Sequence, residues 1–592
     1  MSKASRPPAL PASSPESRPP LRTAAEPALP DPDLERRLDR AGPAAARWKP
    51  LLADFARWVA EEVEPAGNHT HRHAPPVLES HDREGRLVNR IRHNPAWERV
   101  SREVYRRGVV ALNYGADPAP YLVTFAMGYL LSQSSVSLHC PVTMSGAVAH
   151  VLARFAPTTL KERFLPELLR TDGGALSGGT WATELHGGSD IGGTTTVARS
   201  AGGHHRLSGL KWFASNADGG LALATARPVD DDGRSESGTR GLGLYLVPLR
   251  LGDGCPNALR FRRLKDKLGT VGVPTAEVEL DGAVAYEVAP PPDGFRLMME
   301  ALGFSRIHNA MAAAGLQRRA VAEALAYAEG RSAFDSALTG HPMVQEELLR
   351  MMVQAEAGAA LAFEAASSFD AVDTAGVHAI DDADDPRRAW LRLATALAKY
   401  QTAEEAIAAA RSAVEILGGN GYVHDYPTPR LLCDAQVLTV WEGPANVQAL
   451  EVLRMLGNRY PGYAAFLARI ERAIGAAPPR LGSLVAPIAA LFADGREAVA
   501  LVQRDPAEAR RHARRLMALM ADLLAAALLL EEATADLASG DGRKALVLRL
   551  FVEARLAPPP RRGILPGRGW TERRFAELVG YRPIELEAAD LA

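Results

Sequence analysis

The apolar pattern of this 592-residue chain changes twice, and these two changes limit the folds that the chain can adopt. Across residues 47–169 apolar side chains recur at helical spacing. Residues 175–288 instead contain short alternating runs separated by Gly, Asp and Pro, at 205–214, 221–226, 241–249, 258–264 and 275–283. These runs predict antiparallel strands in a small barrel or sandwich. After residue 290 the chain is alanine-rich and helical spacing returns, so we expect helices over residues 295–330, 343–369, 386–417 and 446–456. The predicted fold class is α+β with several domains.

These changes divide the chain into five predicted segments: a disordered tail (1–40), an N-terminal helical domain (41–174), a middle β domain (175–290), a C-terminal helical bundle (291–460) and an additional helical domain (461–592). The tail is rich in Pro, Ala and Ser with few large apolar side chains, so burial cannot offset the entropy lost on ordering. The last segment carries 19 Lys and Arg against 16 Asp and Glu. Four of these arginines, at 510, 511, 514 and 515, fall on one helix face, which is most simply a solvated surface.

Composition narrows the class of protein. The chain is 47% hydrophobic and 23% charged, as expected for an ordinary soluble protein, and its net charge of −2 argues against binding nucleic acid by charge alone. Its three cysteines are far apart and lack metal-type spacing, which is typical of a reducing compartment. The longest apolar run, residues 516–530, is short for a membrane span and contains Asp522, and no apolar core follows the N-terminal charges. We therefore expect a cytoplasmic protein with no membrane partner.

Four motifs carry polar or aromatic groups in arrangements suited to catalysis or ligand binding. The segment VWEGPANVQ (440–448) places a carboxylate, Glu442, between a tryptophan and a glycine, after a glycine-rich turn at 418–421. TWATELHGGSD (180–190) is a loop whose backbone N–H groups and hydroxyls could face an anionic or polar ligand. GLKWFASN (209–216) offers two aromatic rings and a hydroxyl at a strand end, and RSAF (331–334) ends a long helix. Taken singly, each has an ordinary structural interpretation as a helix end, a turn or a core aromatic.

Together, over residues 76–456, these motifs resemble the acyl-CoA dehydrogenase family, whose middle domain is an antiparallel β-barrel between two helical domains. The stretch APPVLESHDREGRLVNRIRHNPAW (74–97), the HCPVTM turn (139–144), RLKDKLG (263–269) and the additional C-terminal domain resemble the AidB-type alkylation-response branch most closely. The resemblance implies FAD as cofactor and an acyl-CoA or related thioester as substrate. It also implies a homo-oligomer, usually a dimer of dimers (homotetramer).

The resemblance also assigns roles to residues. Glu442 would be the catalytic base that removes the proton α to the thioester carbonyl, while flavin N5 takes the β hydride. Arg306 matches an arginine near the substrate. The cofactor-binding residues implied are Thr183, Gly188 and Ser189 in the first loop, Trp212, Phe213 and Ser215 in the strand motif, Arg331 and Phe334 reaching the FAD of a neighbouring subunit, and Gly419, Trp441, Gly443 and Asn446 around the base.

The chain departs from the family pattern at several of these motifs. Leu185-His186 replaces a Pro-Gly, Ala214 an Ile, and Asp335 the glycine that follows Phe334. Pro444 replaces a Thr or Ser and so removes a hydroxyl and a backbone N–H. Thr270-Val271-Gly272 also replaces the usual Arg and Ser after RLKDKLG.

The predicted function is FAD-dependent α,β-dehydrogenation of an acyl thioester. The alternative, from a different class, is an AidB-like flavoprotein that binds DNA through its C-terminal domain and has weak or vestigial dehydrogenase activity. A third reading is a dehydrogenase-like flavin monooxygenase, and the presence of Glu442 counts against it. The sequence does not specify the acyl chain or the electron acceptor.

Overall fold

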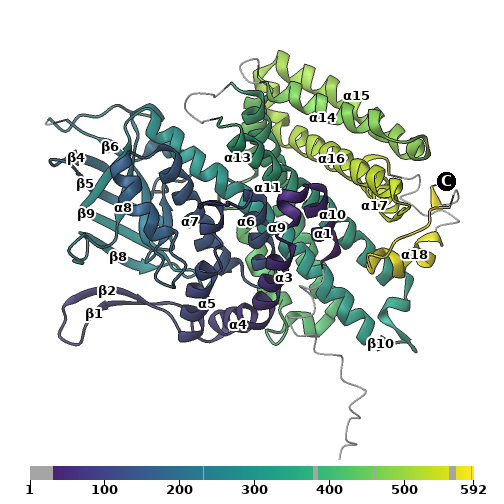
Figure 1. The fold of residues 1–592 in the computed structure, drawn as a ribbon, viewed down its shortest axis with the longest axis horizontal. Helices are drawn as coiled ribbons and strands as arrows, with labels where there is room; N and C mark the ends of the chain where they lie inside the picture. Colours follow the sequence, from purple (N-terminus) through teal and green to yellow (C-terminus); the bar gives the residue numbers. More distant parts are fainter. Residues whose placement is uncertain are drawn as a thin grey trace, which may run out of the picture.

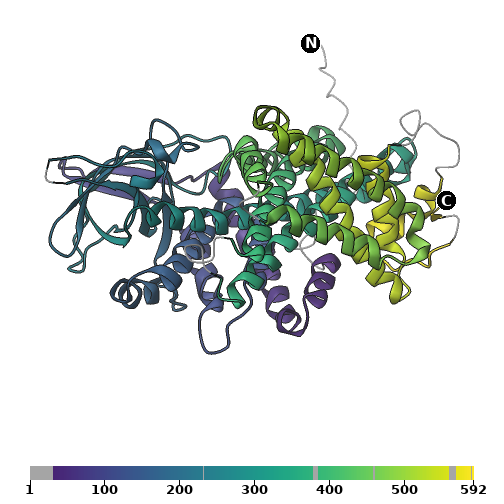
Figure 2. The same cartoon turned by 90° about the horizontal axis from the view of Figure 1, so that it is seen from above.

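The molecule has a β-barrel at one end, helices through its centre and a second group of helices at the other end (Figures 1 and 2). The computed structural model describes residues 31–587 and 590–591, apart from 231, 378–383, 458–460 and 559–568. This order of helical, strand and helical parts agrees with the two changes in apolar pattern and confirms the predicted fold class.

The N-terminal domain is mainly helical, as predicted. Its main helices are α3 (Lys49–Trp58), α4 (Glu64–Arg72), α5 (Pro95–Arg106), α6 (Tyr121–Ser132), α7 (Val136–Phe155) and α8 (Thr158–Leu168). The pattern did not predict the antiparallel hairpin of β1 (Val77–His81) and β2 (Leu87–Arg92), which lies within this domain. By length and composition α7 could cross a membrane, but 83% of its most apolar window is buried inside the protein, as in the core helix of a soluble domain.

The middle domain is a barrel. Its strands are β3 (Ser177–Trp181), β4 (Val197–Ser200), β5 (His205–Ser215), β6 (Gly220–Pro228), β7 (Gly243–Pro248), β8 (Leu259–Leu264) and β9 (Thr275–Ala289). Strands β4, β5, β9, β7 and β6 close a ring, with β3 added beside β6 and β8 beside β9. The pairings are antiparallel except that β6 runs parallel to β3 and β4, a difference from the purely antiparallel prediction. Inward alanines, leucines and valines fill the barrel, as period-two alternation requires.

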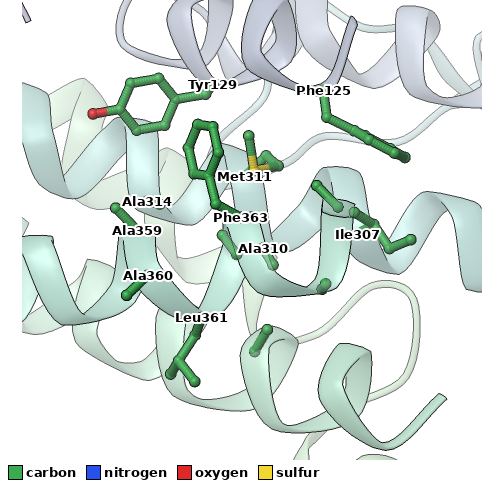
Figure 3. Close-up of a cluster of buried hydrophobic side chains, with 14 of the residues drawn as sticks. Phe125, Tyr129, Ile307, Ala310, Met311, Ala314, Ala359, Ala360, Leu361 and Phe363 are labelled. Carbon is green, nitrogen blue, oxygen red and sulfur yellow. The ribbon is translucent and has the colours of Figure 1, made fainter. Parts of the chain in front are cut away.

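Five helices form the bundle: α9 (Asp293–Gly330), α10 (Pro342–Thr374), α11 (Pro386–Leu417), α12 (Thr428–Leu438) and α13 (Ala445–Met455). Their bounds lie within a few residues of those predicted for the four long segments. Small side chains on α9 and α10 allow the helices to approach closely, and aromatic residues of α6 and α10 fill the remaining space (Figure 3). The labelled members of this cluster include Phe125, Tyr129, Met311, Ala359 and Phe363.

The last segment, residues 461–592, packs on the bundle and shares its hydrophobic core. It contains α14 (Gly462–Ala476), α15 (Gly482–Arg504), α16 (Pro506–Ala538), α17 (Arg543–Phe551) and α18 (Trp570–Val579). The arginine cluster on α16 is exposed, and part of its charge is balanced locally, because Arg511 pairs with Glu508 at 2.5 Å. DNA binding through this segment stays a prediction.

The prediction of a disordered tail to residue 40 is wrong for α1 (Pro32–Arg40), while residues 1–30 lie outside the described part. Asp33 and Arg37 on α1 are buried in an ion cluster formed with α10, α16 and α17. Lys544 Nζ lies 2.8 Å from Asp33 and 2.5 Å from Glu356, and Arg37 Nη1 lies 2.5 Å from Glu532. These partners are distant in sequence, so local composition could not reveal why this polar segment is ordered.

Candidate active site

Glu442 lies in the turn between α12 and α13. Its backbone has φ +59°, in the left-handed region that non-glycine residues seldom adopt and that is found at functional sites. Among the described residues, its buried Oε2 atom has no hydrogen-bond partner. Burial raises the pKa of the Glu442 carboxyl to about 7, although the charges of Arg306 and Lys399 act in the opposite direction. The turn therefore presents a carboxylate that is ready to take up a proton at neutral pH.

The main chain of this turn is held from two sides. Arg306 Nε on α9 donates a hydrogen bond of 2.8 Å to the carbonyl oxygen of Glu442. Gln448 Nε2 on α13 donates to the carbonyl oxygens of Glu442 and Gly443 at 3.1 and 3.0 Å. Gly443 has φ +97°, and an added Cβ would approach Gln448 Nε2 to 2.9 Å, so a side chain would disturb this contact. Arg306, which the sequence placed near the substrate, thus directly fixes the main chain of Glu442.

A second cation near Glu442 was not predicted from the sequence. Lys399 on α11 is buried, and burial lowers its pKa to about 8, while the charge of Glu442 acts to raise it. Lys399 therefore stays mainly protonated at neutral pH. With Arg306 it favours the ionised form of the base.

The predicted flavin loop begins directly after β3. Thr183 is half-buried, while Gly188 and Ser189 are exposed. A Cβ on Gly188 would come within 2.6 Å of Thr183 Oγ1, so only glycine leaves this hydroxyl in place. Beneath the loop, Glu184 accepts hydrogen bonds from the Lys211 ammonium at 2.8 Å and from Thr195 and Thr196. Although burial opposes it, Lys211 holds the pKa of Glu184 down at about 2, so a buried ion pair anchors the loop to β5.

A bulge in β5 decides which aromatic ring is open. The register with β9 shifts between Lys211 and Ala214, and both of these side chains point into the barrel and are buried. Trp212 and Phe213 consequently lie outside the barrel. The Lys265 ammonium lies 3.4 Å from the centroid of the Trp212 ring and 5.0 Å from that of the Phe213 ring, which is still 55% exposed. Phe213 is therefore the ring available to cover a planar ligand.

Continuous contacts connect this strand to the base. Trp441, next to Glu442, packs against Val273 in the turn before β9 and against Cys140 and Met144 of α7. Two residues beyond Val273, Thr275 Oγ1 lies 3.0 Å from Ser215 Oγ. Motifs more than 200 residues apart in sequence thus meet at one junction of barrel and bundle.

Two predicted cofactor residues lie elsewhere. Arg331 and Phe334 follow the end of α9, in the hairpin of β10 (Ser332–Ala333) and β11 (Ser336–Ala337), which lies far from the barrel in Figure 1. Phe334 and Asp335 form its two-residue turn with φ +51° and +61°, the signs that a type I′ turn needs. Asp tolerates this conformation, so it can stand where the family has glycine. The turn leaves Phe334 93% exposed, as a contact with a neighbouring subunit would require.

The remaining cofactor candidates surround these two regions. Gly419 is exposed in the turn after α11, where Asn420 donates a hydrogen bond to Tyr327. Pro444 precedes α13, and its carbonyl oxygen accepts the N–H of Val447 at 2.8 Å, so the helix begins normally without the family's hydroxyl. Asn446 is exposed in the first turn of this helix, where it is open to a ligand.

Comparison with known proteins agrees with this arrangement. Family models match residues 19–172 (adaptive response protein AidB N-terminal domain), 179–283 (acyl-CoA dehydrogenase, middle domain) and 292–457 (acyl-CoA dehydrogenase, C-terminal domain). Acyl-CoA dehydrogenase family member 11 of Caenorhabditis elegans is 32% identical over 75% of this chain and 73% of its own. The chain belongs to the acyl-CoA dehydrogenase family. It is thus an oxidoreductase that acts on CH–CH donors.

Members of the family extend the comparison. The putative acyl-CoA dehydrogenase AidB of Escherichia coli is 32% identical over 65% of this chain and 70% of its own. The crystal structure of C. elegans ACDH-11 in complex with C11-CoA has a TM-score of 0.85 and 28% identity, covering 97% of this chain and 98% of that one. A Bacillus anthracis acyl-CoA dehydrogenase complexed with FAD has a TM-score of 0.72 at 15% identity, with 92% and 93% coverage, and shows the shared fold.

FAD is the cofactor of this family, and the residues present fit it. The loop at Gly188 keeps the Thr183 hydroxyl in place, and Phe213 presents an exposed ring. Hydroxyl groups, exposed backbone and an aromatic surface are the groups that a flavin nucleotide requires. The sequence did not predict the roles of Lys399 and Gln448 beside Glu442, or of Glu184 beneath the flavin loop. The contacts of these three residues depend on the tertiary fold.

Proposed function

We propose that the protein is an FAD-dependent acyl-CoA dehydrogenase in which Glu442 is the catalytic base. The observation that carries this proposal is the carboxylate itself: its buried Oε2 has no hydrogen-bond partner in the described part of the chain, and burial raises the pKa of the carboxyl to about 7. An unpaired buried carboxylate is costly to a fold, and such groups are concentrated at functional sites.

In the proposed reaction Glu442 takes the proton from the α carbon of the thioester, and a double bond forms between the α and β carbons. When bound, FAD supplies the two-electron acceptor for the β hydride. Arg306 and Gln448 keep the main chain of the turn fixed, so the carboxylate need not reorganise. Lys399 and Arg306 favour the ionised form that must be present before the proton moves. A base positioned in this way contributes roughly 10²–10⁴-fold to the rate.

The substrate class follows from the family and from the CoA ester named for the C. elegans structure. We extend that class, a CoA thioester, to this chain. Anaerobic titration of the purified protein with acyl-CoAs of increasing chain length, followed by flavin absorbance, tests the proposal. Bleaching by one chain length supports dehydrogenation and identifies the chain length accepted. A protein that holds FAD, is bleached by dithionite and is bleached by no acyl-CoA would refute it.

We also propose that the protein assembles as a homo-oligomer in which Phe334 of one subunit contacts another. The hairpin turn leaves this aromatic side chain 93% exposed to solvent, with an edge-on contact to His341 of its own subunit at 6.2 Å between ring centroids. Light scattering of the wild type and of Phe334→Ser tests this. An unchanged assembly and unchanged FAD affinity in the variant would refute it.

A further inference from the structure

A line of three polar side chains runs from the bundle side of the barrel to the strand that carries Phe213. Lys267, in the turn before β9, donates hydrogen bonds from Nζ to the carbonyl oxygen of Val273 at 2.7 Å and to Thr275 Oγ1 at 3.1 Å. Thr275 Oγ1 lies 3.0 Å from Ser215 Oγ, directly across the pairing of β5 with β9. Ser215 is two residues beyond Phe213 on the same strand.

The chemistry of these groups sets the direction of the hydrogen bonds. An ammonium group can only donate, so Thr275 Oγ1 must accept from Lys267. This occupies one of the two lone pairs of Thr275 Oγ1. The acceptor that the described residues offer to the single proton of this buried hydroxyl is Ser215 Oγ. Among the residues that the structure describes, Ser215 Oγ has one hydrogen-bond partner, Thr275 Oγ1. If Ser215 accepts from Thr275, its own proton is free to point out of the barrel.

Lys267 is in the required protonation state at neutral pH. Burial lowers the pKa of its ammonium to about 8, and Cys140 and Asp434 nearby act to raise it. A neutral amine could accept a proton from Thr275, and a side chain without nitrogen would leave Thr275 free to accept from Ser215. In either case the Ser215 proton could turn inward.

We propose that Lys267 is a positioning residue of the redox site, which through Thr275 keeps the Ser215 hydroxyl oriented to donate a hydrogen bond to the cofactor. This inference rests on the proposed function for the location of the cofactor beside Phe213. The hydroxyl is the group that touches the cofactor, and Lys267 acts two hydrogen bonds away.

The test uses the midpoint potential of bound FAD, measured by equilibration with a redox dye during dithionite reduction. In the wild-type background, Ser215→Ala removes the hydrogen bond to the cofactor. We expect it to change the reduction equilibrium by about tenfold, which for a two-electron couple is about 30 mV. Thr275→Val alone should change the potential little, because the described residues then offer the Ser215 proton no acceptor that competes with the cofactor.

The decisive comparisons are made within the Lys267→Met background, where the loss of charge is common to all variants. There, adding Ser215→Ala should produce no further shift, because the donation is already lost. Adding Thr275→Val should shift the potential by the same amount as Ser215→Ala does in the wild type, but in the opposite direction, because the inward acceptor is gone. Such reversal is not expected from a merely structural role, which would give additive effects.

The proposal would be overturned if Ser215→Ala shifted the midpoint potential equally in the wild-type and Lys267→Met backgrounds. It would also be overturned if Thr275→Val left the potential of Lys267→Met unchanged. No effect of Ser215→Ala on the potential would overturn it as well. If Lys267→Met fails to fold, Lys267→Leu, which also lacks a nitrogen that could donate to Thr275, takes its place. Because dithionite is the reductant, failure of acyl-CoA to reduce the flavin would refute the proposed function and leave this test decisive.

Discussion

Replacing Glu442 by Gln should lower activity and raise stability at the same time. The folded pKa of about 7 lies above the ordinary value of 4.5, so the carboxyl favours the folded state below pH 4.5. That contribution is lost as pH rises through 7, where the carboxylate must ionise in a buried site. At 1.36 kcal/mol per pKa unit, the loss approaches about 3 kcal/mol at pH 8. Glutamine does not titrate, so the variant should not lose this stability as pH rises.

The assay compares denaturant unfolding of wild type and Glu442→Gln at pH 5 and pH 8, beside anaerobic flavin reduction. The variant should bind FAD, lose roughly 10²–10⁴-fold in reduction rate and gain stability relative to wild type as pH rises. Glu415→Gln is the matched control, because Glu415 is exposed and pairs with Arg411 on the same helix. A stability difference that does not grow with pH would refute the reasoning about burial. Undiminished flavin reduction would refute the role of the base.

Three further predictions concern the surroundings of the base and the frame of the protein. Arg306→Met removes both a hydrogen bond to the turn and a nearby positive charge, so the pH midpoint of flavin reduction should move above 7 and the maximal rate should fall; stopped-flow pH profiles measure both. Phe213→Ala should weaken FAD retention by about tenfold in a filtration assay, whereas Phe213→Trp should retain the cofactor. Glu356→Ala should lower the free energy of unfolding by roughly 3–5 kcal/mol, because it leaves two buried cations of α17 without their shared partner; thermal melts that match the wild type would contradict this.

The long helices and most barrel strands were predictable because their apolar periodicity is local. The predicted helix over residues 386–417 coincides with α11, and His205–Ser215 lies where an alternating run was expected. The short strands β3 and β4 were missed, since β3 contains two glycines and β4 is only four residues long. The hairpin β1–β2 was missed because its strands are largely exposed and polar, without a clear buried face.

The candidate site shows where local motifs stop being sufficient. Glu442 and Phe213 could be chosen from sequence because each lies in a motif with a recognisable family pattern. The side chains that support them could not be chosen in this way. Lys399 occurs in ordinary helical sequence, and Lys267, although it lies in the RLKDKLG motif, acts through neighbours that only the fold brings close. The same reason explains the error at α1. Its buried Asp33 meets a lysine more than 500 residues later, and no local composition encodes that contact.

The position of Glu442 also explains why the turn needs support from two helices. Its left-handed backbone costs of order 1–3 kcal/mol, and ionisation of the buried carboxylate adds to this cost at neutral pH. A chain free to relax would rotate the side chain toward water. Hydrogen bonds from Arg306 and Gln448 to the two carbonyl oxygens oppose that rotation by fixing the main chain, and both donors come from helices in the shared core. The stability of the bundle thus keeps the base in a conformation that it would not adopt alone, and loosening either donor should reduce activity before it reduces folding.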